Sequence, residues 1–223
     1  MAKLNTNRVP DRTVERLSLY RRLLELMRNG EETYVYSHQL GAMANSTAAQ
    51  VRRDLMLLGC PGSPIRGYSV RELIGRIGAF LDAPQGQRIA LVGIGNLGRA
   101  ILAYFSARRP SLCIVAAFDS DPDKVGRVIA GCWCYHVSEL AGVVRREGIR
   151  LGVITVPAGE AQQVADQLVA AGIRGLLNFA PVRVHVPEDV AVEDMDITTS
   201  LEKVAYMTRQ RPSPAARNGA QVA

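Results

Sequence analysis

The sequence predicts an α/β protein in two parts, a helical amino-terminal domain followed by a parallel β-sheet with helices on both faces. Three observations lead to this prediction. Apolar residues recur at helical spacing through residues 10–81, breaker residues cluster at 82–86, and short β-rich segments alternate with helical ones beyond them. The chain has 223 residues, 48 % of them apolar and 22 % charged, which is enough to bury a core in each part.

Composition excludes several classes of protein. No apolar run approaches the roughly 18 residues that a membrane-spanning helix needs. Residues 1–8 are polar and lack the apolar stretch of a signal peptide. Four cysteines are too few for a disulfide scaffold. We therefore expect a soluble, cytoplasmic protein without membrane contact.

The net charge of +6 is spread unevenly. Residues 1–80 hold 12 Lys and Arg against 7 Asp and Glu, whereas residues 81–223 hold 15 against 14. A basic first part indicates a polyanionic partner such as nucleic acid, although many basic faces are merely solvated.

Four helices are expected in the first domain: one over residues 10–30, one beginning near Ser37 as its N-cap, one over residues 45–58, and one over Val70–Leu81. Apolar side chains expected to face the core are Val14, Leu17, Leu23, Leu24 and Met27, then Leu40, Met43 and Ala44, then Val51, Leu55 and Leu58, and finally Leu73, Ile74, Ile77 and Phe80.

The segment from Ser37 to Leu58 is typical of a helix-turn-helix, whose second helix enters the major groove of DNA. Polar side chains along the second helix suit contacts with base edges and phosphates, and Ile65–Tyr68 would form a small wing. The predicted DNA-binding residues are Ser46, Thr47, Gln50, Arg52, Arg53 and Arg66. The alternative is an ordinary three-helix bundle with a solvated arginine face.

In the second part, strands are expected at Ile89–Val92, Leu112–Phe118, Leu151–Val156, Gly175–Phe179 and Val190–Val192, with helices at Leu97–Ala107, Ser138–Glu147 and Glu160–Ala171. A last helix is expected from about Thr199 to Arg209. Residues 212–223 are poor in large apolar side chains and are expected to be disordered.

A glycine-rich loop follows the first of these strands. Its pattern G-x-G-x-x-G stands between a strand and a helix, where the glycines permit a tight turn, close approach of a pyrophosphate and close helix packing. The predicted cofactor-binding residues of this loop are Gly93, Ile94, Gly95, Asn96, Leu97 and Gly98. Asp119 ends the next strand, where it would accept hydrogen bonds from the adenosine ribose and repel a 2′-phosphate. These features predict NAD(H) as the cofactor rather than NADP(H).

Binding a dinucleotide does not make the protein an enzyme. No tyrosine begins a Tyr-x-x-x-Lys pair, and His38, His136 and His185 lack an obvious orienting carboxylate. Hydride-transfer enzymes usually need such an acid or base. We therefore expect a sensor without catalytic residues. Two alternatives remain, an NAD-dependent oxidoreductase with an appended helical domain and a CoA-binding module of the same sheet fold.

The cysteines offer no strong site. Two ligands in Cys132-Trp133-Cys134 without a second pair make a poor zinc site, so no metal is expected. We expect these two side chains to point to opposite faces of a strand, which disfavours a mutual disulfide. Cys60 and Cys113 suggest no role.

With both parts considered together, the chain resembles the redox-sensing transcriptional repressors of the Rex family over almost its whole length. The segments that carry the resemblance are Val14–Leu17, Val51–Leu55, Val92–Gly98, Phe118–Gly126, Thr155–Ala158 and Gly175–Val182. Two segments depart from the family pattern. Leu57-Leu58-Gly59 replaces Tyr-Phe/Trp-Gly after the recognition helix, and Pro64–Tyr68 replaces an Arg-Gly-Val-Gly-Tyr wing.

The resemblance implies a homodimer that binds double-stranded operator DNA at an inverted repeat and releases it when NADH binds. It implies a winged-helix DNA-binding domain over residues 1–84, a Rossmann-type NAD(H)-binding domain over 85–197 and a domain-swapped helix over 198–211. It also implies site residues. Residues bordering the nicotinamide would be Thr155, Val156, Pro157, Asn178, Phe179 and Pro181, and residues coupling the cofactor to the DNA-binding domain would be Arg16, Tyr104 and Asp196.

Overall fold

The computed structural model describes residues 9–28, 33–106 and 111–210. The chain divides into two compact units, Met1–Gln85 and Gly86–Ala223. The expectation for residues 212–223 lies outside the described residues. Each unit is described by itself below.

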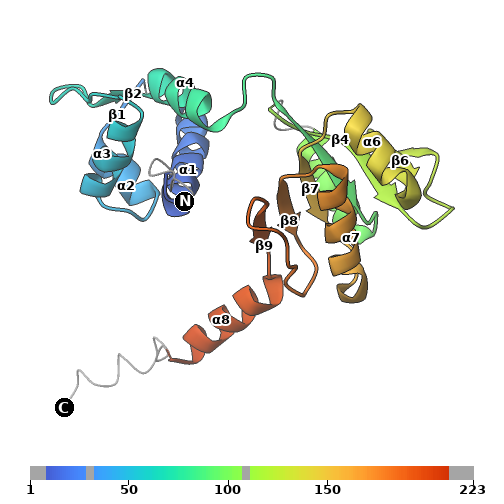
Figure 1. Ribbon diagram of the computed structural model, residues 1–223. Helices are drawn as coiled ribbons and strands as arrows, with labels where there is room; N and C mark the ends of the chain where they lie inside the picture. Colours follow the sequence, from blue (N-terminus) through green and yellow to red (C-terminus); the bar gives the residue numbers. More distant parts are fainter. Residues whose placement is uncertain (1–8, 29–32, 107–110, 211–223) are drawn as a thin grey trace, which may run out of the picture. The chain divides into compact units, whose positions relative to one another are not determined.

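In residues 9–28 and 33–85, the described part of the amino-terminal unit, there are four α-helices and a two-stranded antiparallel sheet (Figure 1). The helices are α1 (Asp11–Arg28), α2 (Ser37–Met43), α3 (Ala48–Leu57) and α4 (Val70–Leu81), and the strands are β1 (Tyr34–Val35) and β2 (Tyr68–Ser69). Ser37 is the first residue of α2 and not its N-cap as expected. Tyr36 takes that position, and its backbone N–H donates to the Gln39 side chain at 2.8 Å.

A single apolar core joins the four helices of this unit. Leu17, Tyr20 and Leu24 of α1 are fully buried, and they cluster with Leu40, Val35, Val51, Leu55, Leu73 and Ile77. Val14, Met43 and Phe80 are exposed, contrary to the sequence expectation. Each lies in the first or last turn of its helix, and an adjacent residue, Thr13, Ala44 or Leu81, is the one that faces the core instead.

The turn between α2 and α3 is tight enough to require a glycine. A Cβ atom on Gly41 would lie 2.8 Å from the Ser46 carbonyl oxygen, and the Ser46 N–H donates to the Gly41 carbonyl at 2.8 Å. Asn45 adopts a positive φ of 50°, which asparagine tolerates better than most residues. The Thr47 side chain then caps α3 by accepting from the Gln50 N–H at 3.1 Å. Together these contacts produce the predicted helix-turn-helix.

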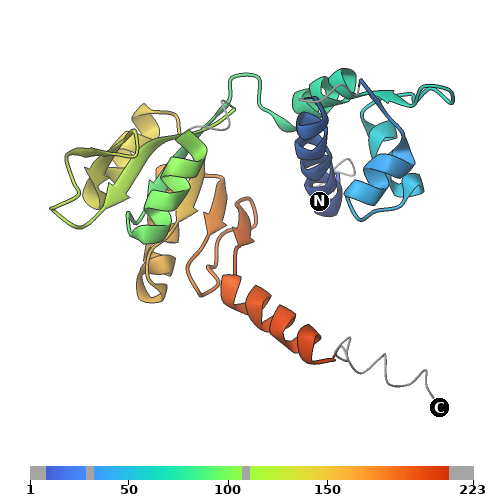
Figure 2. The same cartoon turned by 180° about the vertical axis from the view of Figure 1, so that it is seen from behind.

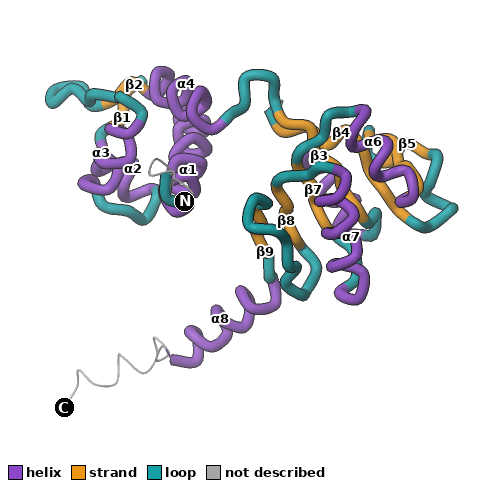
Figure 3. The backbone as a smooth tube through the Cα atoms, in the orientation of Figure 1, coloured by secondary structure: helices purple, strands orange, loops and turns teal. Residues whose placement is uncertain are grey.

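The second unit is built on a seven-stranded sheet (Figures 1 and 3). Its strand order is β5-β6-β4-β3-β7-β8-β9, and every neighbouring pair is parallel except β5 with β6. The strands are β3 (Gln87–Val92), β4 (Leu112–Asp119), β5 (Arg127–Ile129), β6 (Cys132–His136), β7 (Leu151–Ile154), β8 (Gly175–Asn178) and β9 (Ala191–Asp194). Neither the edge strand β5 nor its neighbour β6 is among the five strand ranges predicted from the sequence, although Cys132 and Cys134 were expected to lie on a strand. The two strands form a short hairpin turned by Ala130 and Gly131, both at positive φ.

Helices cover both faces of the sheet, as the alternating pattern predicts. On one face, α5 (Asn96–Ser106) packs Ile101 and Leu102 against β3 and β4. The other face carries η1 (Val137–Glu139), α6 (Leu140–Arg146) and α7 (Ala158–Ala171), and the buried side chains of α6 and α7 belong to the largest buried cluster. Helices α6 and α7 lie in front of the sheet in Figure 1, and the green helix α5 lies in front of it in Figure 2. The last helix, α8 (Ile197–Gln210), has no buried residue in this chain.

Cys132 and Cys134 lie on the same face of β6, and the expectation of opposite faces is wrong. Both side chains are buried, while Trp133 between them is exposed. Residues two apart on a strand share a face because side chains alternate along it.

Candidate functional site

A cleft of about 520 Å³ lies at the carboxyl ends of the central strands. Strand β3 stands between β4 and β7, so the connections leaving β3 and β7 run to opposite sides of the sheet. Such a switch point is where doubly wound sheets bind ligands. The cleft is lined by Val92, Gly93, Gly95, Leu97, Asp119, Ser120, Asp121, Lys124, Val137, Thr155, Val156, Pro157, Glu160, Val164 and Phe179.

The glycine-rich loop matches the geometry that a pyrophosphate needs. Gly93 has a φ of 98°, and a Cβ atom there would lie 2.8 Å from the Thr155 carbonyl oxygen. A Cβ atom on Gly98 would lie 2.1 Å from the Gly93 carbonyl oxygen, so the helix and loop could not pack with any other residue. At Gly95 a Cβ atom would meet nothing within 4 Å, because it would project into the cleft. The loop thus leaves open the space at the amino end of α5 where phosphates bind.

Asp119 at the end of β4 holds this loop in place. Its Oδ2 accepts the Ile94 N–H at 2.7 Å, and its Oδ1 accepts the Asp121 N–H at 2.9 Å. Burial by itself raises the pKa of Asp119, but these hydrogen bonds and the Lys124 ammonium outweigh burial and leave its pKa below the ordinary value. The carboxylate is therefore charged at neutral pH and orients the backbone of the phosphate loop.

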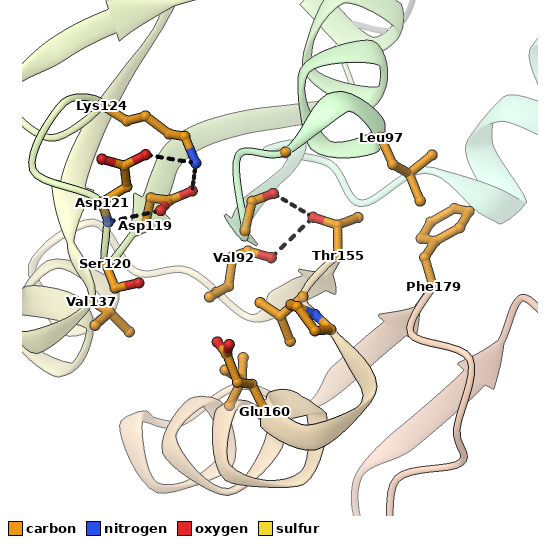
Figure 4. A pocket seen from close by; sticks show the side chains of 15 residues that line it. Val92, Leu97, Asp119, Ser120, Asp121, Lys124, Val137, Thr155, Glu160 and Phe179 are labelled. Atoms are coloured by element: carbon orange, nitrogen blue, oxygen red, sulfur yellow. Dashed lines mark hydrogen bonds and ion pairs between the residues drawn. The ribbon is translucent and has the colours of Figure 1, made fainter.

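One end of the cleft is charged and the other is apolar (Figure 4). At the charged end, Lys124 Nζ lies 3.2 Å from Asp119 Oδ2 and 3.3 Å from Asp121 Oδ2. At the opposite end, Leu97 and Phe179 point toward one another. Thr155 lies between the two ends, and its hydroxyl is 2.7 Å from the Gly93 carbonyl oxygen. A charged end suits the adenosine ribose, and an apolar end suits a nicotinamide ring.

Some predicted cofactor residues do not line the cleft. The Ile94 side chain is fully buried, and only its backbone N–H takes part in the loop. Asn178 is also fully buried, and its amide donates to the Val182 carbonyl and to Asp194 while accepting the Ala180 N–H. It therefore braces the loop after β8. Also outside the lining are Asn96, Gly98 and Pro181.

Seven lining residues were not predicted as site residues: Val92, Ser120, Asp121, Lys124, Val137, Glu160 and Val164. Asp121 and Lys124 could have been predicted from the sequence, because both follow Asp119 within Phe118–Gly126, one of the segments that resemble the Rex family. Glu160 and Val164 lie one turn apart on α7, and no sequence pattern pointed that helix face toward the loop.

The predicted DNA-binding residues lie on or beside α3. Arg52 and Arg53 are exposed; the Arg52 guanidinium donates to the Ser37 hydroxyl at 3.1 Å, and Arg53 donates to the Gln50 side chain at 3.4 Å. Thr47 caps the helix, and Ser46 precedes it. These side chains surround the amino end and outer face of a helix suited to the major groove.

Arg66 lies at the tip of the predicted wing. Ser63 and Gly67 form an antiparallel bridge through two 2.8 Å backbone hydrogen bonds, which leaves Ile65 and Arg66 exposed. The Tyr36 hydroxyl donates to the Ile65 carbonyl at 2.5 Å and ties the wing to the start of α2.

An acidic residue of α3 is buried against α1. The Asp54 carboxylate is bound by both Nε and Nη2 of Arg16, by the Tyr20 hydroxyl at 3.1 Å and by the Gln50 amide at 2.9 Å. Burial alone raises the pKa of Asp54, yet the hydrogen bonds from Arg16, Gln50 and Tyr20 leave it below the ordinary value. Sequence reasoning missed this residue.

The other two predicted coupling residues lie in the second unit. Tyr104 is half-exposed on α5, with its ring edge-on to Phe105. Asp196 precedes α8 and caps it, because its carboxylate accepts both the N–H and the hydroxyl of Thr199 at 2.8 and 2.6 Å.

Among residues 9–28, 33–106 and 111–210, no three His, Cys, Asp or Glu side chains gather closely enough to hold a metal ion. Within the same residues no helix is both long enough and apolar enough to cross a membrane.

Comparisons with known families match the two units separately. A family model described as "CoA binding domain" matches residues 85–182, and one described as "Putative DNA-binding protein N-terminus" matches residues 8–55.

Comparisons over the whole chain agree with one another. The chain is 36 % identical over 208 residues to a protein of Listeria welshimeri named redox-sensing transcriptional repressor Rex, covering 93 % of this chain and 97 % of that one. It resembles the crystal structure of RSP, a Rex-family repressor, in complex with NAD⁺ and operator DNA, with a TM-score of 0.84, 29 % identity and 97 % and 100 % coverage. The structure of RSP with NADH gives a TM-score of 0.80 at 31 % identity, covering 91 % of this chain and 95 % of that one.

Proposed function

This chain belongs to the Rex family of redox-sensing transcriptional repressors, and we propose that it binds an inverted-repeat operator as a homodimer and releases it when NADH binds. It is a DNA-binding regulator that senses NAD(H), and not an enzyme. The observation that carries the proposal is the presence in one chain of a winged helix-turn-helix with exposed arginines and of a dinucleotide cleft.

Cofactor binding would use the two ends of the cleft. Gly93, Gly95 and the amino end of α5 would hold the pyrophosphate, Asp119 would orient the loop and face the ribose, and Thr155–Pro157 with Phe179 would border the nicotinamide. The carboxylates at the ribose end also argue against coenzyme A, whose adenosine ribose carries a phosphate that they would repel.

DNA binding would use α3 and the wing. Gln50, Arg52 and Arg53 lie on the helix, Ser46 and Thr47 lie at its amino end, and Arg66 lies at the wing tip. These groups can contact phosphates and base edges in one major groove and its border. Leu57 and Pro64 replace an aromatic and a basic family position nearby, so the operator preference of this chain should differ from that of its relatives.

Dimer formation would use α8. Ile197, Leu201 and Val204 recur along one side of this helix and are all exposed in the single chain. An amphipathic helix with no buried residue needs a partner for its apolar side. We propose that α8 packs on a second copy of the chain, with exchange of the helix between subunits.

The decisive experiment measures operator affinity with each form of the cofactor. A duplex selected by the full-length protein from a random pool is titrated with protein, and binding is followed by fluorescence anisotropy. We expect saturating NADH to weaken binding by at least about tenfold and NAD⁺ to leave it nearly unchanged, a difference of about 1.4 kcal/mol. If the protein binds the operator with the same affinity in the presence of NADH as in the presence of NAD⁺, the sensing proposal is contradicted.

The dimer is tested by sedimentation equilibrium. Leu201→Glu should shift the protein toward monomer and weaken operator binding, while Lys203→Glu, on the other side of the same helix, should leave the mass unchanged. A Leu201→Glu protein that remains dimeric would exclude α8 from the interface.

A further inference from the structure

The charged end of the cofactor cleft contains a lysine bound between two carboxylates. Lys124 Nζ is 3.2 Å from Asp119 Oδ2 and 3.3 Å from Asp121 Oδ2, and all three residues line the cleft. Their summed formal charge is −1. A simple reading of the sequence assigns discrimination against NADP(H) to Asp119 alone, but that reading leaves out the ammonium group beside it.

The two carboxylates differ in how much of their capacity is already used. Asp119 accepts hydrogen bonds from the Ile94 N–H, the Asp121 N–H and Lys124, and its side chain is only 10 % exposed. Asp121 accepts the Asp123 N–H on Oδ1 at 2.9 Å and Lys124 on Oδ2, and its side chain is 41 % exposed. Most of the hydrogen-bonding capacity of Asp119 is therefore used within the loop, whereas Asp121 is the more exposed of the two carboxylates that line the cleft.

We propose that Asp121 and Lys124 are the specificity-determining pair of this cleft, in which the Asp121 carboxylate repels a 2′-phosphate and holds the Lys124 ammonium away from it. A 2′-phosphate brings about −1.5 to −2 charges near pH 7, so the present net charge of −1 disfavours it. Removing the Asp121 charge leaves Asp119 and Lys124 balanced. The ammonium then has N–H donors available for the phosphate.

The inference rests on the proposed NAD(H) site and extends it. Lys124 is an unexpected group in a site selective for NAD(H), because a free ammonium there would attract a 2′-phosphate. Because its ammonium is paired with two carboxylates, the site can contain this lysine and still be selective for NAD(H). The Lys124 side chain is 24 % exposed, so it can still reach a ligand in the cleft.

The test compares isosteric substitutions that remove one charge each. Asp121→Asn keeps an acceptor for the Asp123 N–H and removes the charge that faces Lys124. Asp123→Asn removes an equal charge from an exposed neighbour in the same turn and serves as the matched control. Lys124→Met removes the ammonium while keeping its apolar stem, with Arg127→Met as its control.

Calorimetric titration of the full-length dimer with NADH and with NADPH gives the ratio of their dissociation constants. We expect Asp121→Asn to lower the NADPH-to-NADH ratio by about tenfold or more and Lys124→Met to raise it by a similar factor, each about 1.4 kcal/mol. Both controls should leave the ratio within about twofold of the native value, since exposed charges farther away are screened. Adenosine 2′,5′-bisphosphate against AMP should show the same changes, because only the ribose end is then probed.

Three results would overturn the inference. If Asp123→Asn lowers the ratio as much as Asp121→Asn, the change in selectivity comes from the net charge of the region and not from the Asp121–Lys124 pair. If Lys124→Met leaves the ratio unchanged while NADH still binds, the ammonium has no part in selectivity and the proposed cofactor site stands. If the native protein binds neither NADH nor NADPH, the proposed function fails together with the inference. Should Asp121→Asn unfold, as circular dichroism would show, Lys124→Met decides alone.

Discussion

Arg16 of α1 holds Asp54 of α3 through two hydrogen bonds, Nε to Oδ2 at 2.7 Å and Nη2 to Oδ1 at 2.8 Å. The pair joins residues 38 positions apart, and its carboxylate is almost fully buried. The predicted coupling residue of the DNA-binding unit is thus bonded directly to the predicted recognition helix. Any movement of Arg16 would move α3 or leave a buried charge without its partner.

The first prediction concerns the stability of this link. Asp54→Ala should lower the free energy of unfolding by about 2–4 kcal/mol, because it leaves Arg16 and Tyr20 without their buried acceptor. Urea unfolding followed by circular dichroism measures the change. Glu72→Gln, which removes an exposed partner of Arg76, is the control and should cost no more than about 0.5 kcal/mol. If Asp54→Ala and Glu72→Gln lose equal free energies of unfolding, the buried Arg16–Asp54 pair contributes no more to stability than an exposed ion pair.

The second prediction concerns acid. The pKa of Asp54 is below its ordinary value in the folded protein, so the unfolded chain binds this proton more readily. The stability that the carboxylate contributes is therefore complete above about pH 4 and falls as the pH drops through the folded pKa. Unfolding curves between neutral pH and pH 3 should show a shallower acid decline for Asp54→Asn than for the native protein. If the free energy of unfolding falls equally steeply with acid in both proteins, the lowered pKa of Asp54 is contradicted.

The third prediction concerns DNA. Arg52→Ala and Arg53→Ala should each weaken operator binding, and for a phosphate contact the slope of log affinity against log salt should fall by about one. Arg22→Ala, an exposed arginine of α1, is the control and should change neither. Native affinity in both α3 variants would place the DNA-contacting surface elsewhere.

The fourth prediction separates two glycines of the phosphate loop. Gly95→Ala should leave the melting temperature unchanged and abolish NADH binding, because its Cβ would meet no protein atom and would occupy the cleft. Gly98→Ala should lower the melting temperature, because its Cβ would lie 2.1 Å from the Gly93 carbonyl oxygen. Thermal unfolding and calorimetry measure the two effects. Tight NADH binding by Gly95→Ala would rule out this loop as the phosphate site.

The fifth prediction concerns coupling between the cofactor and DNA. Asp196 is predicted to be a coupling residue, and it also caps α8. Asp196→Asn keeps a capping acceptor and removes the charge, whereas Asp196→Ala removes both. If the charge couples NADH to DNA release, both variants should blunt the effect of NADH on operator affinity, as should Tyr104→Phe. An effect of Asp196→Ala alone would assign the residue to capping.

The sequence predicted best those features that depend on residues close together in the chain. The helical spacing of Leu17 and Leu24 and the order of strand, glycine loop and helix around Gly93 each follow from a few neighbouring residues. Local periodicity could not show that Phe80 would be exposed, because the burial of a terminal turn depends on what packs beside it.

The parts of the site that could not be predicted depend on distant pairings. Nothing near Asp54 in sequence identifies Arg16 as its partner, and nothing near Glu160 indicates that it lines the same cleft as the glycine loop. Asn178 matched a position that borders the nicotinamide, but its amide is fully used in bracing its own loop. Such assignments require the positions of side chains that only the folded chain brings together.

The two buried cysteines of β6 are protected from thiol oxidation, which is a second kind of cellular redox chemistry. Burial, with a smaller contribution from Cys134, raises the pKa of Cys132 to about 11. At neutral pH only on the order of one molecule in ten thousand then carries a thiolate at this position. A thiolate that solvent can reach attacks peroxides and disulfides, so these two buried thiols react with neither at an appreciable rate. Strand β6 thus stays chemically unchanged when the thiol pool is oxidised.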